Sequence, residues 1–208
     1  MTLGEARELA RSLFLETLPC LRVGPRVREA IRLAGKVVGI RGEVFPIPHG
    51  RTIRVVSLGK AAIEMADAAA QQLTGARFRG IVVAPGEPVQ RQSEYEYFRG
   101  GHPYPDEGSW RAAGAVLHFL RDCSPDDLVL FLISGGGSAL LDQPLYSSVS
   151  PSVTLDDLRR FHQVLVTSGA AIEEINALRK HFSAVKGGRL AEQAAPATQV
   201  TLYVSDVP

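Results

Sequence analysis

The most informative part of this chain is the stretch Leu128–Leu140, LVLFLISGGGSAL, in which an apolar run leads directly into three adjacent glycines. The apolar run predicts a buried strand, and Gly135–Gly137 leave the bend after it without β-carbons. Several backbone N–H groups can then approach one ligand oxygen, which is how chains bind phosphate. Ser134 and Ser138 flank the glycines and add two hydroxyl donors.

The bend matches none of the standard glycine motifs. No GxxxxGK[ST] sequence occurs in the chain, and Leu140 occupies the position of the last glycine of both GxGxxG and GxSxG. The alternative to an anion site is a tight turn that needs positive φ angles, which a single glycine would satisfy.

Composition narrows the class of protein. The chain has 208 residues, of which 45% are hydrophobic and 22% charged, as in an ordinary globular protein. Its net charge of +1 does not suggest nonspecific binding to nucleic acid or to a membrane surface. Cys20 and Cys123 show no metal-ligand spacing and no disulfide framework, so we expect both to be reduced and in apolar surroundings.

The chain shows no sign of membrane insertion or export. Its apolar segments all fall short of the roughly 18 residues needed to span a bilayer. The N-terminal sequence is charged and helical in pattern rather than a signal peptide. We therefore expect a cytoplasmic protein.

The order of strands and helices predicts the fold class. Apolar spacing predicts helices over residues 3–18 and 25–35, and residues 36–50 are strand-like and rich in turns. From residue 52 onward, predicted strands alternate with predicted helices. The strands are 52–58, 80–84, 95–98, 127–133 and 199–204, and the helices are 60–73, 107–120, 155–167, 170–181 and 189–194. This alternation predicts an α/β fold, a Rossmann-like parallel sheet with helices on both faces.

Lys60 follows the strand Thr52–Leu58 and a single glycine, Gly59, at the start of the next helix. Ligands of open α/β sheets bind at the carboxyl ends of the strands, where this residue is expected to lie. A lysine at a helix N-terminus opposes the macrodipole, and an incoming anion would account for its presence. The alternative is a solvated surface lysine.

Two further polar segments are candidates for ligand binding. In the loop 100–108, two prolines stiffen the chain around His102, which either binds substrate or bridges backbone groups. On the predicted helix 170–181, Asn176 and Arg179 share one face, and Lys186 precedes a pair of glycines. This polar, basic face suits an anion, and the alternative is an ordinary solvated helix face.

Asp206 comes directly after the last predicted strand, 199–204. An acidic residue at that position is suited to holding Mg²⁺ or to accepting a proton. The alternative is an N-cap for a following helix.

Taken together, five segments in this order resemble the glycerate 2-kinase family, the class II glycerate kinases of the MOFRL type. They are GKAA at 59–62, GGHPYPDE at 100–107, LISGGGSALL at 132–141, the N-x-x-RKH-x-S-x-x-KGG-x-LA run at 176–191, and SDVP at 205–208. The resemblance extends from about residue 5 to the end. GGGSAL by itself is only moderately specific, whereas five such segments in one order are highly specific.

The resemblance implies ATP-dependent phosphorylation of the 2-hydroxyl of D-glycerate, giving 2-phosphoglycerate, with ATP and Mg²⁺ as cofactors. It also implies a two-domain protein about twice as long, with the active site in the cleft between the domains. Residues 1–208 would then be the large N-terminal domain, incomplete at its C-terminus, and the second MOFRL-type domain would be absent.

The resemblance also implies roles for individual residues. Lys60 would neutralise charge on the transferring phosphoryl group, and Asp206 would bind the metal or activate the substrate hydroxyl. His102, from the proline-stiffened loop, is a further candidate contact of the substrate or phosphate. The nucleotide loop would be Ser134, Gly135, Gly136, Gly137 and Ser138, and the phosphate or the glycerate carboxylate would be held by Asn176, Arg179 and Lys186.

Two other functions remain open. A hydroxypyruvate reductase of tartronate and glycerate metabolism would need a dinucleotide glycine pattern followed by an acidic residue, and the chain shows none. A non-catalytic module that binds phosphorylated ligands would need only the glycine bend. The expected partners are D-glycerate and ATP, without nucleic acid or membrane. The oligomeric state is open, with a homodimer among the options.

Overall fold

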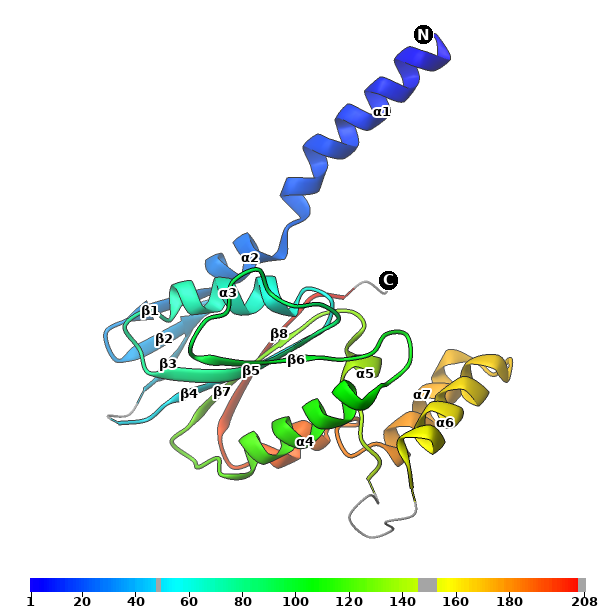
Figure 1. Ribbon diagram of the computed structural model, residues 1–208. Helices are drawn as coiled ribbons and strands as arrows, with labels where there is room; N and C mark the ends of the chain where they lie inside the picture. Colours follow the sequence, from blue (N-terminus) through cyan, green and yellow to red (C-terminus); the bar gives the residue numbers. More distant parts are fainter. Residues whose placement is uncertain (48–49, 146–152, 206–208) are drawn as a thin grey trace.

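The computed structural model describes residues 1–47, 50–145 and 153–205, and its centre is a five-stranded parallel sheet (Figure 1). The strand order is β6-β5-β4-β7-β8. In chain order within this sheet it reads 3-2-1-4-5, the arrangement of a Rossmann-like fold, so the predicted fold class is confirmed. The strands are β4 (Ile53–Leu58), β5 (Phe78–Ala84), β6 (Tyr95–Arg99), β7 (Leu128–Ile133) and β8 (Thr198–Tyr203).

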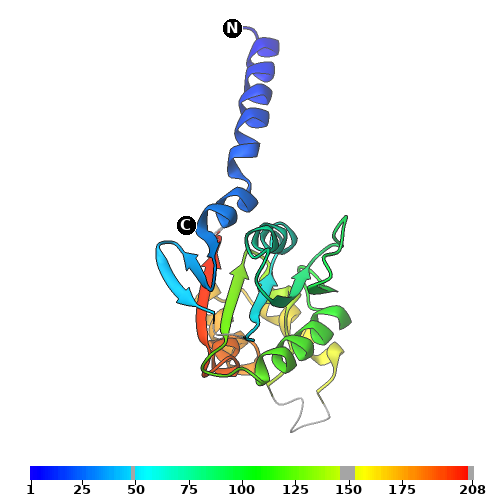
Figure 2. The ribbon, with the colours of Figure 1, turned by 90° about the vertical axis from the view of Figure 1, so that its left-hand side faces the viewer.

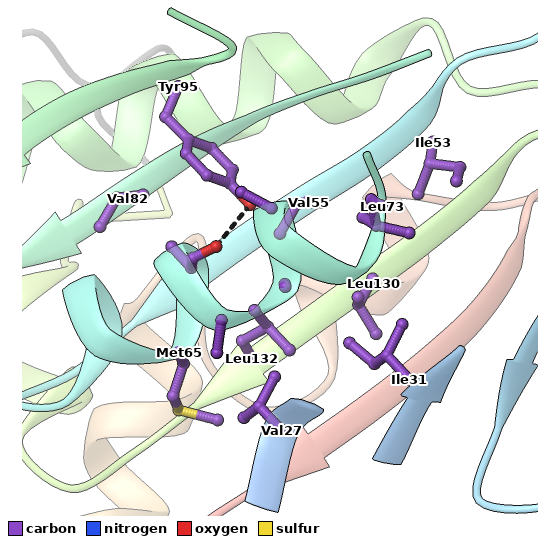
Figure 3. Close-up of a cluster of buried hydrophobic side chains, with 14 of the residues drawn as sticks. Val27, Ile31, Ile53, Val55, Met65, Leu73, Val82, Tyr95, Leu130 and Leu132 are labelled. Atoms are coloured by element: carbon purple, nitrogen blue, oxygen red, sulfur yellow. Dashed lines mark hydrogen bonds between the residues drawn. The ribbon is translucent and has the colours of Figure 1, made fainter. Parts of the chain in front are cut away.

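Helices cover both faces of this sheet, and each face has its own hydrophobic core. On one face lie α2 (Val23–Ala30) and α3 (Ala62–Gln72), and on the other lie α4 (Glu107–Arg121) and α8 (Arg189–Gln193). Figure 3 shows the first core, which includes Met65 of α3, Leu73 directly after this helix, and Val55 and Leu130 of the sheet. The alanines of α3 are buried because their small side chains let the helix approach the strands closely.

A second, three-stranded antiparallel sheet packs against the first core. It contains β1 (Ile31–Ala34), β2 (Val37–Ile40) and β3 (Glu43–Pro46). The predicted helix 25–35 is wrong at its C-terminal end, because α2 ends at Ala30 and the chain continues as β1. Ile31 pairs with Ile40 and both are buried, so tertiary packing of a β-branched side chain overrides the helical spacing.

The first helix projects away from the rest of the molecule (Figure 2). α1 (Leu3–Thr17) begins with a capping box between Thr2 and Glu5, and it contains no buried residue; the following turn η1 (Leu18–Leu21) contains none either. The prediction that both cysteines lie in apolar surroundings is wrong for Cys20, which is exposed, whereas Cys123 is half-buried. None of the helices in the described ranges is both long and apolar enough to cross a membrane.

Three more helices follow the glycine bend. The short α5 (Gly137–Leu140) begins within the bend, and α6 (Leu155–Thr167) and α7 (Ile172–Phe182) form a helical pair beside it (Figure 1). Thr154 caps the start of α6. Its hydroxyl accepts from the backbone N–H of Asp157, and the Asp157 carboxylate accepts from the backbone N–H of Thr154. As a member of this pair, α7 lies beside the glycine bend at the carboxyl edge of the sheet.

Candidate functional site

The candidate site lies where the strand order of the sheet reverses, between β4 and β7. The loops after these two strands are joined by hydrogen bonds. The backbone N–H of Lys60 donates to the carbonyl of Gly135 at 2.9 Å, and the N–H of Ala61 donates to the Ser134 hydroxyl at 3.0 Å. In open α/β sheets the ligand crevice forms at such a reversal, outside the carboxyl ends of the strands.

Two glycines allow these loops to meet. Gly59 has a φ of +122°, and a β-carbon there would lie 2.3 Å from the hydroxyl and 2.4 Å from the carbonyl oxygen of Ser134. Gly136 has a φ of +87°, and a β-carbon there would lie 3.2 Å from Cδ2 of His102 and 3.2 Å from Cε of Lys60. The structure therefore brings Lys60 and His102 together over the glycine bend, although they are 42 positions apart in the chain.

A small cavity of about 240 Å³ opens between the bend and the helical pair. Arg179 of α7 is half-buried at this cavity, and its Nε atom is buried without a hydrogen-bond partner among the described residues. A buried guanidinium N–H that lacks an acceptor is costly, and a bound anion would supply the acceptor. The lining residues are His102, Pro103, Gly136, Ser138, Ala139, His162, Val166 and Arg179.

The loop that carries His102 is held by the start of α4. Asp106 caps this helix by accepting from the backbone N–H of Ser109 at 2.8 Å. The N–H of Gly101 donates to the Asp106 carboxylate and to the Ser109 hydroxyl, each at 2.9 Å. Asp106 is therefore structural, and it holds the backbone next to the exposed His102, which lines the cavity.

Not every predicted site residue faces the cavity with a free polar group. The Ser134 hydroxyl is engaged, because it accepts from Ala61 and donates to the carbonyl of Leu58 at 3.4 Å. Asn176 lies one turn before Arg179 on α7, is half-buried, and is not among the lining residues. Lys186 is turned toward Asp142, with its Nζ 2.7 Å from Oδ1. Their roles in ligand binding stay predictions.

Asp206 lies outside the described residues, so its predicted role is not tested. The chain approaches the site just before it, because the N–H of Val204 donates to the carbonyl of Ile133 at 2.9 Å, at the end of β7. Within the described part of the chain, the side chains form no group of three or more histidine, cysteine or acidic residues that could hold a metal ion.

Sequence reasoning did not identify Asp142 and His162. Both side chains are buried, and the His162 Nε2 atom lies 2.7 Å from Oδ2 of Asp142. Burial by itself raises the pKa of the Asp142 carboxyl, but contacts with His162, Lys186 and Ser183 outweigh burial and hold the pKa below its usual range. One signal was available, because His162 falls on the apolar stripe of its helix, between Leu158 and Leu165.

Residues 9–208 match a family described as a domain of unknown function (DUF4147). The chain belongs to this family. The match begins inside α1, so it includes the whole parallel sheet and every element around the cavity.

Individual relatives support the resemblance to glycerate 2-kinases. The chain is 42% identical over 166 residues to a D-glycerate 2-kinase of Thermotoga maritima, which covers 79% of this chain and 39% of that protein. It is 44% identical over 179 residues to an Agrobacterium vitis protein provisionally named as a hydroxypyruvate reductase, which covers 86% of this chain and 40% of that protein. The resemblance to the glycerate 2-kinase family is confirmed.

The crystal structure of a related protein has a similar fold. The structure of a Pyrococcus horikoshii protein superposes with a TM-score of 0.77 and 35% identity, covering 97% of this chain and 44% of that chain. This agreement supports the Rossmann-like arrangement around the site. The chain spans about two fifths of the length of the curated relatives it matches, at 40% and 39% of the two named above.

Proposed function

We propose that this chain supplies the nucleotide- and anion-binding part of a kinase that transfers a phosphoryl group from ATP to the 2-hydroxyl of D-glycerate, giving 2-phosphoglycerate. The observation that carries the proposal is the convergence of Lys60, His102 and Arg179 around the glycine bend at the carboxyl edge of the sheet. The names of relatives such as the Thermotoga maritima D-glycerate 2-kinase support this substrate.

Each group at the edge has a distinct part in this proposal. The backbone N–H groups of residues 135–138 bind phosphate oxygens, because glycines leave them accessible. The Lys60 ammonium neutralises charge that spreads over the transferring phosphoryl oxygens, and Arg179 holds the carboxylate of glycerate with its paired N–H groups. His102 lines the cavity and orients the substrate. Phosphoryl transfer depends on such positioning and charge neutralisation more than on covalent catalysis.

Magnesium enters the proposal through Asp206 and the nucleotide. Mg²⁺ bound to ATP keeps several waters and phosphate oxygens as ligands, so one or two protein carboxylates are enough to hold it. When bound, the ion would neutralise charge on the phosphates, and Asp206 is the residue we propose to hold it. A cytoplasmic location and a homodimer remain predictions.

The proposal is tested by incubating the protein with MgATP and D-glycerate and measuring 2-phosphoglycerate. The Lys60→Ala variant should lower turnover by about 10²–10³-fold, the usual loss when one preorganised charge at the transition state is removed. Lys36→Ala is the matched control, because Lys36 is an exposed lysine in the β1–β2 turn. Near-normal turnover by Lys60→Ala would remove the role given to Lys60, and a wild type that binds neither MgATP nor D-glycerate would contradict the proposal.

The second candidate is reduction of hydroxypyruvate, which the provisional name of the Agrobacterium vitis relative favours. Oxidation of NADH in the presence of hydroxypyruvate would support it. The loop after β4 has a single glycine, Gly59, where a dinucleotide-binding loop of this fold carries a GxGxxG pattern, so the kinase remains the better supported function.

A further inference from the structure

Asp142 is the centre of a buried hydrogen-bond network behind the cavity. Its Oδ2 accepts from Nε2 of His162 at 2.7 Å, and its Oδ1 accepts from the Ser183 hydroxyl at 2.6 Å and from Nζ of Lys186 at 2.7 Å. Asp142 is 2% exposed and the Lys186 side chain 13% exposed. The carboxylate is therefore fully satisfied by side chains that come from α6, from the end of α7 and from the turn after it.

The backbone reinforces this network. The N–H of Leu145 donates to the carbonyl of Phe182 at 2.8 Å, and the N–H of Ala184 donates to the carbonyl of Gln143 at 2.7 Å. Nζ of Lys186 also donates to the carbonyl of Leu141 at 3.3 Å. The segment just after α5 is thus tied to the segment just after α7, which connects the glycine bend to the helix that carries Arg179.

Lys186 and Arg179 have different surroundings, although both were predicted to bind the anion. The ammonium of Lys186 already has an acidic partner, a carbonyl acceptor and little exposure. Arg179 faces the cavity and has a buried N–H without an acceptor. A cation with an ionised partner at 2.7 Å gains little from a second anion, whereas an unpartnered guanidinium gains a charge-assisted hydrogen bond.

We infer that Asp142 and Lys186 are positioning residues, whose buried ion pair holds the glycine bend against α7, and that Arg179 rather than Lys186 contacts the bound anion. The inference deepens the proposed function and rests on it for the identity of the anion. Independently of any ligand, the two charges stabilise the protein only as a pair.

A double-mutant cycle with Asp142→Asn and Lys186→Met separates the two roles. Asparagine has the shape of aspartate, still accepts from Ser183, and can donate to His162 when the imidazole changes tautomer. Methionine replaces the lysine stem with an unbranched apolar chain of similar length. Each single variant leaves one charge buried without its partner, whereas the double variant removes both charges and keeps the packing.

The first readout is the melting temperature. Each single variant should lower Tm by about 10 °C, because breaking a buried pair is strongly destabilising in a domain of this size. The double variant should recover to within about 3 °C of the wild type, since removing both partners of a buried pair is close to neutral. Losses in the two single variants that simply add in the double variant would overturn the inference, whatever the protein binds.

The second readout is the affinity for D-glycerate, measured by calorimetric titration in the presence of MgATP. The single variants should bind roughly tenfold more weakly, because the bend and Arg179 are displaced, and the double variant should recover to within about threefold. A double variant that binds as weakly as Lys186→Met would show that Lys186 itself contacts the anion and would overturn the inference.

Asp127→Asn serves as the matched control. Asp127 is a buried carboxylate 3.8 Å from Nη2 of Arg54, at the opposite, N-terminal end of β7. This variant should lower Tm and leave the affinity for D-glycerate unchanged. If the wild type binds no D-glycerate, the proposed function fails, whereas the melting-temperature cycle still decides whether Asp142 and Lys186 act as a pair.

Discussion

The close approach of the loops after β4 and β7 makes a sharp prediction about Gly59→Ala. Alanine at this position carries two costs. A positive φ costs an L-residue about 1–2 kcal/mol, and forcing atoms into a packed site costs about 1–3 kcal/mol more. The second cost applies because the new β-carbon would lie 2.4 Å from the backbone carbonyl oxygen of Ser134, which cannot turn aside as a side chain can.

Gly75→Ala provides the matched control. Gly75 also has a positive φ, +98°, but a β-carbon there would meet only Cδ2 of Leu33, at 3.8 Å. This variant should carry the conformational cost alone, about 1–2 kcal/mol. The free energy of unfolding of Gly59→Ala should therefore fall by about 2–5 kcal/mol, which corresponds to a drop in Tm of about 5–15 °C in a domain of this size.

Urea denaturation followed by circular dichroism measures both variants under one set of conditions. Since the Ser134 hydroxyl also anchors the turn through Ala61, Gly59→Ala should in addition weaken nucleotide binding. Equal losses of stability in the two variants would contradict this prediction. They would show that the loops after β4 and β7 are not in contact, and the site built on that contact would fall with it.

Two further predictions concern the first helix and acid stability. Deleting residues 1–21 should change Tm by less than about 2 °C in a thermal melt, because none of the side chains in α1 and η1 is buried; a large drop would show that this helix packs on the domain. The lowered pKa of the Asp142 carboxyl means that its contribution to stability is complete above about pH 4, the ordinary range of an aspartate, and is lost as the pH falls through the depressed pKa. The difference in Tm between the wild type and Asp142→Asn should therefore shrink in melts below about pH 4. A constant difference down to pH 2 would contradict a stabilising role of the ionised Asp142 carboxylate.

Much of the parallel sheet was predictable from local patterns. Apolar runs such as Leu128–Ile133 are long enough and sufficiently well bounded by glycines to indicate buried strands. The predicted helices 107–120 and 155–167 agree closely with α4 and α6, and in the structure each of these helices begins with a capping box. The α2–β1 boundary was not predictable, since Ile31 fits a helical stripe as well as it fits a strand.

The candidate site, too, was predictable only in part. The glycine bend and Lys60 carry their own local signals, and placing both at one sheet edge follows from the rule that parallel strands end together. The difference between Arg179 and Lys186 carries no such signal, because both are basic residues on one polar segment. Only the positions of Asp142 and of the cavity distinguish the engaged lysine from the unpartnered arginine.

Local patterns in the sequence were enough to predict the family, the alternation of strands and helices, and the positions of the glycine bend and Lys60 after their strands, because hydrophobic period and glycine placement act within a few positions of the chain. Which polar groups are satisfied by the protein, and which can bind a ligand, became clear only from the three-dimensional structure. That distinction depends on partners such as Asp142 and Lys186, which lie 44 positions apart and meet only when α7 docks beside the bend.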